Sequence, residues 1–242
     1  MGTTLFISDL HLSDSTPAIE AGLYQLLDQQ STLDRLYVLG DFFEYWIGDD
    51  DDTPLHRRII DRLAAVSAGG CDVFLVHGNR DFMLGTNFAK ATGATLLEDT
   101  TVIEVLGKPT LIMHGDTLCT DDTEYQKLRA VMHDPVWKTN ILQQSLDERR
   151  ALAESLRTAS KEKAENDPGN IVDVNLDEVQ AVMSAAGVSR LIHGHTHRPD
   201  RHQTPAGERI VLGDWTSQLG WYLEETQGTL RLQSFELPQT YV

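Results

Sequence analysis

Cysteine is scarce in this sequence. Among 242 residues there are only two, Cys71 and Cys119, and they stand far apart along the chain. This excludes a disulfide framework and a CxxC zinc site, because both need closely or regularly spaced cysteines. We therefore expect two buried thiols that take no part in chemistry.

Long hydrophobic runs are also missing. No segment approaches the roughly 18 consecutive apolar residues that a membrane-spanning helix needs. The first residues, MGTTLFISDLHL, do not combine a basic region with a long apolar one, so they do not resemble a secretory signal. We expect a cytoplasmic protein.

Basic residues are outnumbered as well. The chain has 20 lysines and arginines against 37 aspartates and glutamates, which gives a formal net charge of −17. A nucleic-acid footprint needs basic surface to displace counterions, and broad adhesion to anionic lipid has the same requirement. We therefore expect no nucleic-acid partner.

What the sequence does contain is an alternation of short apolar runs with longer amphipathic ones. The apolar runs are rich in Val, Leu and Ile, end in Gly or Asp, and predict buried strands; they occupy 4–8, 35–40, 71–78, 109–115, 189–194 and 209–213. Helical spacing is found over 17–30, 54–68 and 177–187, and residues 209–236 indicate strands with breaks at Gly220 and Gly228. This alternation predicts an α/β fold.

Residues 123–166 depart from this pattern because they form a long helical stretch without a strand. Pro135 breaks the stretch once, and the turn residues DPGN at 167–170 close it. We interpret 123–167 as a helical cap insertion, with 1–122 and 168–242 forming one core domain.

Five polar clusters follow predicted strands. They are SDLHL (8–12), GDFFE (40–44), HGNRD (77–81), MHGD (113–116) and HGHTH (193–197). In open α/β sheets, ligands bind beyond the carboxyl ends of the strands. The clusters are therefore expected to meet at one site although they lie far apart along the chain.

The residue types in these clusters predict a metal centre. The candidate ligands offer carboxylate or amide oxygen and imidazole nitrogen, without thiolate; they are Asp9, His11, Asp41, Asn79, His114, His195 and His197. This mixture suits Mn, Fe, Co, Ni or Zn, and seven ligands are too many for one ion. Two ions that share a bridging carboxylate can clamp a phosphate and lower the pKa of a bound water. His193, at the end of its strand, is expected to be structural.

The motifs DLH (9–11), GD (40–41), GNRD (78–81), HGD (114–116) and GHTH (194–197) resemble those of the calcineurin-type metallophosphoesterases. The resemblance covers about 4–215 and implies a four-layer α/β/β/α sandwich with a dinuclear site. It also implies how the ligands divide between two ions: Asp9, His11 and His197 on one, Asn79, His114 and His195 on the other, with Asp41 bridging.

A narrower resemblance, carried by GDFFEYWIGDD (40–50), MHGDTLCTDD (113–122) and LIHGHTHRP (191–199), is to the pyrophosphatases that act on UDP-2,3-diacylglucosamine. It implies hydrolysis at the α-phosphate, giving UMP and 2,3-diacylglucosamine 1-phosphate in lipid A biosynthesis. It implies two Mn(II) ions, with other divalent metals as alternatives. It also implies a monomer in peripheral contact with the cytoplasmic face of the inner membrane.

The same resemblance assigns roles to single residues. Asn79, Arg80 and His195 are expected at the reacting phosphate, and Asp122 and Ser160 at the rest of the substrate. An ion pair with Asp81 is the alternative for Arg80. The chain departs from the family pattern at 161–168, where Ala164 and Asp167 replace Asn and Lys; Lys161 or Lys163 is the alternative source of that cation.

The cap carries apolar residues at helical spacing, and these offer a groove for acyl chains. They are Leu128, Val131, Met132, Trp137, Ile141, Leu142 and Leu146. Ordinary packing between cap and core is the alternative, and both hold if the groove lies between the two layers. A soluble nucleotide or phosphodiester, hydrolysed by the same dinuclear centre, is the rival substrate.

Overall fold

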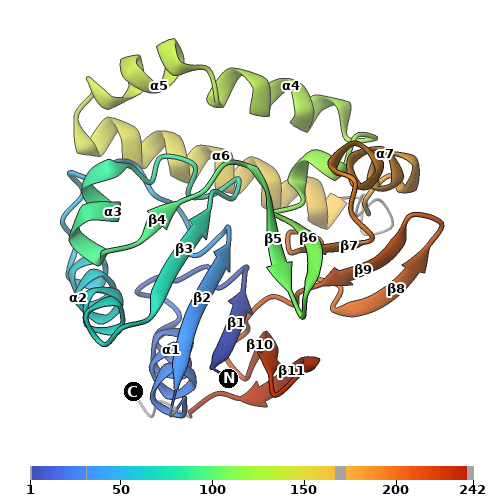
Figure 1. The fold of residues 1–242 in the computed structure, drawn as a ribbon. Helices are drawn as coiled ribbons and strands as arrows, with labels where there is room; N and C mark the ends of the chain where they lie inside the picture. Colours follow the sequence, from blue (N-terminus) through green and yellow to red (C-terminus); the bar gives the residue numbers. More distant parts are fainter. Residues whose placement is uncertain (1, 31, 167–172, 239–242) are drawn as a thin grey trace.

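Two β-sheets pack face to face, and helices cover both outer faces (Figure 1). The computed structural model describes residues 2–30, 32–166 and 173–238, with side chains described for 2–30, 32–159 and 173–238. The first sheet runs in the order β11 (Thr229–Glu236), β10 (Leu219–Thr226), β1 (Thr3–Ile7), β2 (Leu33–Leu39), β3 (Asp72–Val76) and β4 (Thr95–Leu96). The second runs in the order β5 (Thr100–Val105), β6 (Lys108–Met113), β7 (Arg190–His193), β9 (Gly207–Val211) and β8 (Asp200–Thr204).

Alternation along the central strands separates the layers. In β1, Leu5 and Ile7 join the cluster of apolar side chains that includes Leu23 and Ile59 from the outer helices. Phe6, between them, joins the cluster that contains Ile112 of the second sheet. Successive side chains of a strand point to opposite faces, so one continuous apolar run serves two cores at once.

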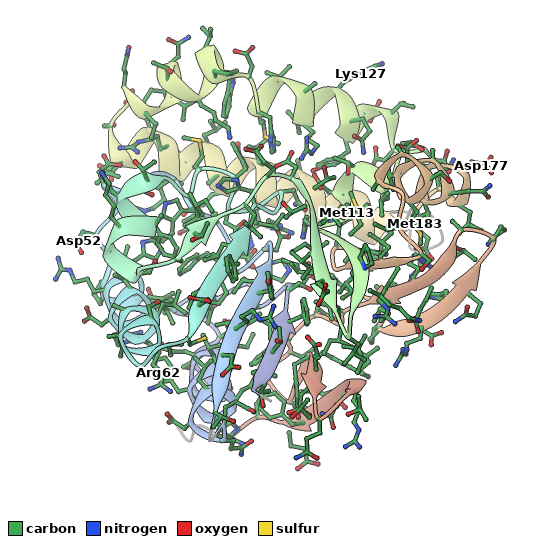
Figure 2. All side chains as sticks on the ribbon, in the orientation of Figure 1. Asp52, Arg62, Met113, Lys127, Asp177 and Met183 are labelled. Carbon is green, nitrogen blue, oxygen red and sulfur yellow. The ribbon has the colours of Figure 1, made fainter. Side chains whose placement is uncertain are left out.

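Three helices cover the first sheet and one covers the second. The first three are α1 (Pro17–Asp28), α2 (Pro54–Ala68) and α3 (Thr86–Thr92); the last is α7 (Leu176–Ala186). Met113 of β6 and Met183 of α7 belong to one buried cluster and lie close together in Figure 2. The order of layers is therefore α/β/β/α, and the predicted fold class is confirmed.

Most predicted elements are present, with two corrections. Gly228 stands in the turn between β10 and β11 as expected, but Gly220 lies inside β10 and does not break it. The stretch after residue 122 contains three helices rather than two: α4 (Thr123–Met132), α5 (Pro135–Leu142) and α6 (Leu146–Asn166). Both cysteines are buried, as predicted.

The second break in the helical stretch has a local cause. The side chain of Glu148 accepts a hydrogen bond from the backbone N–H of Ser145 at 2.9 Å, and Oγ of Ser145 accepts one from the backbone N–H of Glu148 at 3.3 Å. This is a capping box, the S-x-x-E signal that starts a new helix. The sequence SLDE carries it at 145–148.

The three helices α4, α5 and α6 lie across the end of the molecule toward which β1, β2 and β3 point (Figure 1). Within the described ranges, no helix is both long enough and apolar enough to cross a membrane. The division into a core and a separate cap remains our interpretation.

Arg149 ties α6 to the loop after β2. Its guanidinium is 3% exposed and donates to the carbonyl of Ile47 at 2.7 Å and to Asp50 at 2.8 and 2.5 Å. Removing the guanidinium leaves the Ile47 carbonyl without this donor, and an unpaired polar group in a buried place is costly.

We therefore expect Arg149→Met to lower the free energy of unfolding by about 1.5–3 kcal/mol, the usual range for hydrogen bonds to charged groups. Urea unfolding would measure it. Arg57→Met is the matched control, since Arg57 pairs with Asp52 on the open surface of α2 and such pairs contribute little. Equal unfolding midpoints for the two variants would contradict the anchoring role.

Candidate active site

The seven candidate ligands converge at the carboxyl ends of five strands. Each stands in the segment that follows β1, β2, β3, β6 or β7. Ligand atoms of five of them form two overlapping groups, and within each group the atoms lie within 4.8 Å of one another: Asp9, His11 and His197, and Asp9, Asp41 and His114. Residues separated by nearly the whole chain therefore form one polar cluster.

In the first group, Nε2 of His197 lies 3.3 Å from Oδ1 of Asp9 and 3.4 Å from Nε2 of His11. In the second, Nε2 of His114 lies 3.6 Å from Oδ1 of Asp41. Oδ2 of Asp41 lies 4.0 Å from Nε2 of His11, so this carboxylate faces both groups. A carboxylate in that position is suited to bridge two ions.

Asn79 and His195 complete the second group. Oδ1 of Asn79 lies 3.0 Å from Nε2 of His114, and the ring centroid of His195 lies 5.0 Å from that of His114. The backbone N–H of His195 donates to Oδ2 of Asp9 at 2.9 Å. All seven candidates are thus brought together, while their role as ligands remains a prediction.

Five of the seven candidates have a left-handed backbone. The positive φ angles are 55° at Asp9, 50° at His11, 49° at Asp41, 66° at His195 and 55° at His197. Among the described non-glycine residues only Leu106 and Gln227 share this conformation, and both stand in hairpin turns. Left-handed backbone is strained for most side chains and persists where the surroundings enforce it, as at functional sites.

Backbone hydrogen bonds between the strand-end loops enforce this geometry. The N–H of Asp9 donates to the carbonyl of Gly40 at 3.1 Å, and the N–H of His11 donates to that of Asp41 at 3.0 Å. The N–H of Trp215 donates to the carbonyl of Asp9 at 3.0 Å. Asp9, His11 and Asp41 are therefore fixed by neighbouring loops rather than by their own turns alone.

Asp81 joins two of these loops through hydrogen bonds to their backbone. Its buried carboxylate accepts hydrogen bonds from the backbone N–H groups of Gly78 at 2.8 Å and Phe42 at 2.7 Å. The Asp81 side chain is thus committed to the backbone, and the predicted alternative of an Arg80–Asp81 ion pair is wrong. Arg80 pairs instead with Glu44, with 3.2 Å between Nη1 and Oε1.

Buried carboxylates dominate the electrostatics. Burial raises the pKa of Asp41 to about 7, with the nearby charges of Asp81 and Asp9 adding to the shift. Burial alone would lower the pKa of His114, but the charges of Asp41 and Asp9 outweigh it and raise that pKa to about 9. Near neutral pH the cluster therefore retains protons in a place where a divalent cation would supply the compensating charge.

Two imidazoles are held in the form that binds metals. Burial lowers the pKa of His11 to about 3 and that of His195 to about 4. Both rings are therefore neutral near pH 7, which leaves a nitrogen lone pair for a ligand bond.

One carboxylate oxygen supports the metal interpretation further. Oδ1 of Asp9 is buried and accepts no hydrogen bond from the described residues. Oδ2 of the same group accepts from Oγ of Ser8 at 2.6 Å and from the N–H of His195. A buried carboxylate with one satisfied and one open oxygen, surrounded by imidazole nitrogens, fits a hard or borderline divalent ion.

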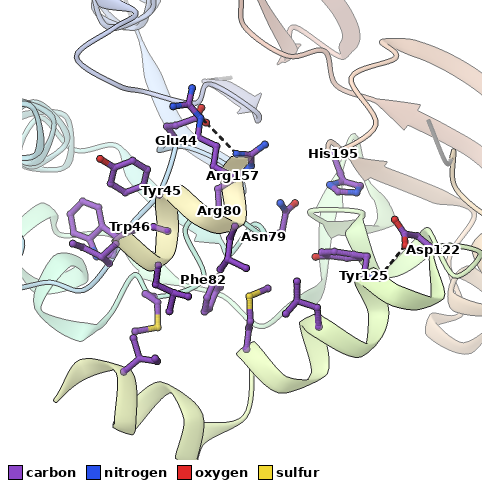
Figure 3. A pocket seen from close by; sticks show the side chains of 18 of the residues that line it. Glu44, Tyr45, Trp46, Asn79, Arg80, Phe82, Asp122, Tyr125, Arg157 and His195 are labelled. Atoms are coloured by element: carbon purple, nitrogen blue, oxygen red, sulfur yellow. Dashed lines mark hydrogen bonds and ion pairs between the residues drawn. The ribbon is translucent and has the colours of Figure 1, made fainter. Parts of the chain in front are cut away.

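A cavity of about 550 Å³ opens beside this cluster (Figure 3). Its polar end includes Asn79, Arg80, Asp122, His195 and His197. Its apolar end lies among side chains of the core and of the helices α4–α6: Trp46, Phe82, Met83, Leu128, Met132, Trp137, Ile141, Leu152 and Leu156. One cavity thus joins a candidate metal centre to an apolar chamber.

Two other predicted substrate contacts have different outcomes. Asp122 lines the cavity and also caps α4, because its Oδ1 accepts from the backbone N–H of Tyr125 at 3.0 Å. Ser160 lies in α6, but its side chain is outside the described residues, as are those of Lys161, Lys163 and Ala164. Asp167 is also outside them.

Several residues of the site were not predicted from the sequence. Glu44 lies 3.7 Å from Nδ1 of His11 and accepts from Nε of Arg157 at 2.6 Å (Figure 3). Oδ2 of Asp214 lies 3.6 Å from Nδ1 of His197. Asp214 follows β9 as Gly-Asp, the same pattern that marked Asp41, so this signal was present in the sequence.

Tyr125 is a further residue that the sequence did not reveal. Its hydroxyl donates to the buried carboxylate of Asp116 at 2.6 Å, and its ring faces His195 with an angle of 29° between the planes. Arg129, one turn further along α4, also donates to Asp116 at 2.6 Å. Asp116 therefore attaches α4 to the core directly beside the candidate metal centre.

Close packing of backbone against the ligands gives a direct test. A Cβ atom on Gly194 would collide with Oδ2 of Asp9 and Oγ of Ser8. We expect Gly194→Ala to weaken Mn(II) binding by about 10–100-fold, the range seen when groups supporting a ligand are disturbed. Equilibrium dialysis with elemental analysis would measure this.

Gly69→Ala is the control for that variant, because Gly69 is exposed and its Cβ would come no nearer than 3.3 Å to other atoms. If both proteins are folded by circular dichroism and bind Mn(II) equally well, the proposed position of the metal centre is wrong.

Comparison with solved structures shows the same fold. An archaeal phosphodiesterase matches with a TM-score of 0.51 and 11% sequence identity, over 97% of this chain and 99% of that one. A hypothetical protein from Pyrococcus horikoshii also has a TM-score of 0.51, at 12% identity, over 98% of this chain and 88% of that one.

Comparison with curated sequences gives much closer relatives. A protein of Cellvibrio japonicus named UDP-2,3-diacylglucosamine hydrolase is 48% identical, over 97% of this chain and 99% of its own length. A protein of the same name from Marinobacter nauticus is 46% identical, over 93% and 94%. The sequence pattern of the calcineurin-like phosphoesterases matches residues 2–199, and the chain belongs to this family.

Proposed function

We propose that this protein hydrolyses UDP-2,3-diacylglucosamine at the α-phosphate, giving UMP and 2,3-diacylglucosamine 1-phosphate in lipid A biosynthesis. The observation that carries the proposal is the single cavity with a ligand cluster at one end and an apolar chamber at the other. The relatives named UDP-2,3-diacylglucosamine hydrolase support it at 46–48% identity.

The polar end holds the cofactor in this proposal. Asp9, His11 and His197 would bind one Mn(II) and Asn79, His114 and His195 a second, with Asp41 between them. Ions held there would polarise a phosphate and lower the pKa of a bound water, which is the nucleophile that hydrolysis requires. Other divalent metals suit the same oxygen and nitrogen ligands.

The protein's own side chains position the substrate. Arg80 is held by Glu44 next to Asn79, so its guanidinium can exchange this carboxylate for a phosphate oxygen. Glu44 also holds Arg157 of α6, so phosphate binding and the position of α6 are linked through one carboxylate. In the reaction, Arg80 stabilises charge that builds up on the phosphate oxygens.

The apolar end would receive the acyl chains. Of the seven apolar residues singled out in the sequence, four line the cavity: Leu128, Met132, Trp137 and Ile141. Val131 and Leu142 are about half exposed, and neither they nor Leu146 lines the cavity. So many apolar side chains in the lining are not needed to bind a soluble nucleotide, which favours the lipid over the rival substrates.

We further propose a monomer that makes weak peripheral contact with the cytoplasmic face of the inner membrane. A diacylated substrate remains in the membrane until its chains enter the cavity. Exposed apolar side chains on α4 and α5, such as Val131 and Val136, are available near that cavity for contact with lipid.

The central experiment is turnover of UDP-2,3-diacylglucosamine by the pure protein. We expect release of UMP, identified by mass, in the presence of Mn(II) and its loss after the metal is removed with a chelator. Restoring Mn(II) should restore turnover. A metal-loaded protein that hydrolyses a simple phosphodiester but releases no UMP from the lipid would favour a soluble substrate instead.

The apolar chamber can be tested by Ile141→Gln. A polar side chain in the chamber reduces the apolar area available to the acyl chains, and a loss of about 1.5 kcal/mol lowers kcat/KM for the diacylated substrate by about tenfold. Hydrolysis of a soluble aryl phosphodiester should change little.

Asn140→Gln is the control for this variant, because Asn140 lies on the same helix, is exposed and does not line the cavity. If Ile141→Gln lowers turnover of both substrates equally, the residue supports the structure rather than the acyl chains.

A further inference from the structure

A second, smaller cavity of about 220 Å³ lies next to the first. Its polar lining consists of Asp173, Thr196, Arg198, Asp200, His202 and Arg209. Two of these residues, Thr196 and Arg198, also line the first cavity, so the two cavities meet at the segment that carries His195 and His197. The segment that carries two of the candidate metal ligands therefore borders both cavities.

Two polar atoms in the lining are buried and have no partner among the described residues. They are Nε of Arg209 and Oγ1 of Thr196, on residues that are only 4% and 7% exposed. Leaving a buried donor unpaired is energetically unfavourable. A site that retains two such groups is built to have them satisfied by something that enters it.

His193 holds Arg209 in this position. Its Nε2 lies 3.3 Å from Nη1 of Arg209, and its Nδ1 lies 2.9 Å from the carbonyl of Gly194. When Nδ1 of His193 donates to the Gly194 carbonyl, Nε2 can accept from the guanidinium of Arg209. This role accounts for a buried histidine that is not one of the candidate metal ligands.

The charges that line the second cavity do not favour binding of an anion. Asp173 pairs with Arg198 at 2.9 Å and lies 3.8 Å from Nη1 of Arg209. Together with Asp200 there are two carboxylates for two guanidinium groups, so the cavity has no large positive potential. Its donors and acceptors instead match a neutral ligand that carries both.

We propose that this cavity binds the nucleoside part of the substrate, a uracil ring with its ribose. The inference rests on the proposed function, since it assigns a place to the uridine of the UDP group. Uracil offers two carbonyl acceptors and one N–H donor, which the guanidinium groups and carboxylates of the lining can satisfy. Ribose hydroxyls both donate and accept, as do Thr196 and His202.

Size and shape agree with this ligand. A whole small-molecule site usually occupies about 300–1,000 Å³, so a cavity of about 220 Å³ fits one part of a substrate rather than all of it. Pro199 and Val211 supply apolar walls against which a flat ring can lie.

The position also suits the direction of cleavage. Water adds its oxygen to the α-phosphorus, and the bond from that phosphorus to the bridging oxygen breaks. The β-phosphate leaves with the acylated sugar, which occupies the first cavity. The α-phosphate stays attached to uridine, so the second cavity holds the UMP half while the lipid half departs.

The test uses His202→Ala and Asp200→Asn, because both residues line the second cavity and not the first. Loss of one hydrogen bond corresponds to about 0.5–1.5 kcal/mol, so we expect kcat/KM for the UDP lipid, divided by that for an aryl phosphodiester, to fall about 2–10-fold. Gln203→Ala is the control, since Gln203 is an exposed neighbour on β8 that lines neither cavity.

A binding measurement with uridine completes the design. Uridine has no phosphate, so saturation-transfer NMR of its ring protons reports the nucleoside cavity without the metal centre. We expect transfer with the wild type and Gln203→Ala, and reduced transfer with His202→Ala and Asp200→Asn. Adenosine, whose base is larger, should give a weaker signal.

The outcomes separate this inference from the proposed function. If the UDP lipid is hydrolysed but the two variants behave like Gln203→Ala, the nucleoside cavity is wrong and the function stands. If no protein releases UMP from the lipid, while uridine binds the wild type and loses binding in the variants, the cavity stands and the proposed function falls. Equal loss of lipid and aryl diester turnover, with uridine binding unchanged, would also overturn the inference.

Discussion

The structure depends on placing carboxylates in a buried cluster at the carboxyl ends of the central strands. Asp9 and Asp41 are almost completely buried, and their ligand atoms lie within 4.8 Å of a shared histidine, His114. Two carboxylates this close repel one another unless protons or cations compensate. Backbone N–H groups aimed at Asp9 from His195 and at Asp41 from Arg80 offset part of the cost. The remaining charge favours a divalent ion.

The four-layer core makes this arrangement possible because it fixes the strand ends from both sides. Apolar side chains between the sheets and under the helices hold β1, β2, β3, β6 and β7 in register, so the loops that follow them have little freedom. Five candidate ligand residues with left-handed backbone are held in this frame. Favourable packing in the core therefore offsets the strain of the left-handed backbone, which is how such backbone persists at functional sites.

Much of this could be predicted because it follows from short-range patterns. Strand periodicity and polar residues after Gly or Asp located all seven candidates, including Asp41 and His197. Glu44, Tyr125 and Arg157 could not be found this way, because their partners depend on how α4 and α6 lie over the core. Asp214 and the capping box at Ser145 were different: both signals were present in the sequence and were not used.

The side chains of segment 193–198 contact two different parts of the molecule. His195 and His197 belong to the candidate metal centre, whereas His193 turns away from it and holds Arg209. Thr196, between the two candidate ligands, borders both cavities. In the proposed reaction, a loop arranged in this way would place the reacting phosphate at the boundary between an apolar chamber and a polar one. For a substrate with acyl chains on one side of a diphosphate and a nucleoside on the other, the point of cleavage would then be set by where each half fits, with the phosphate between them held beside the candidate metal ligands.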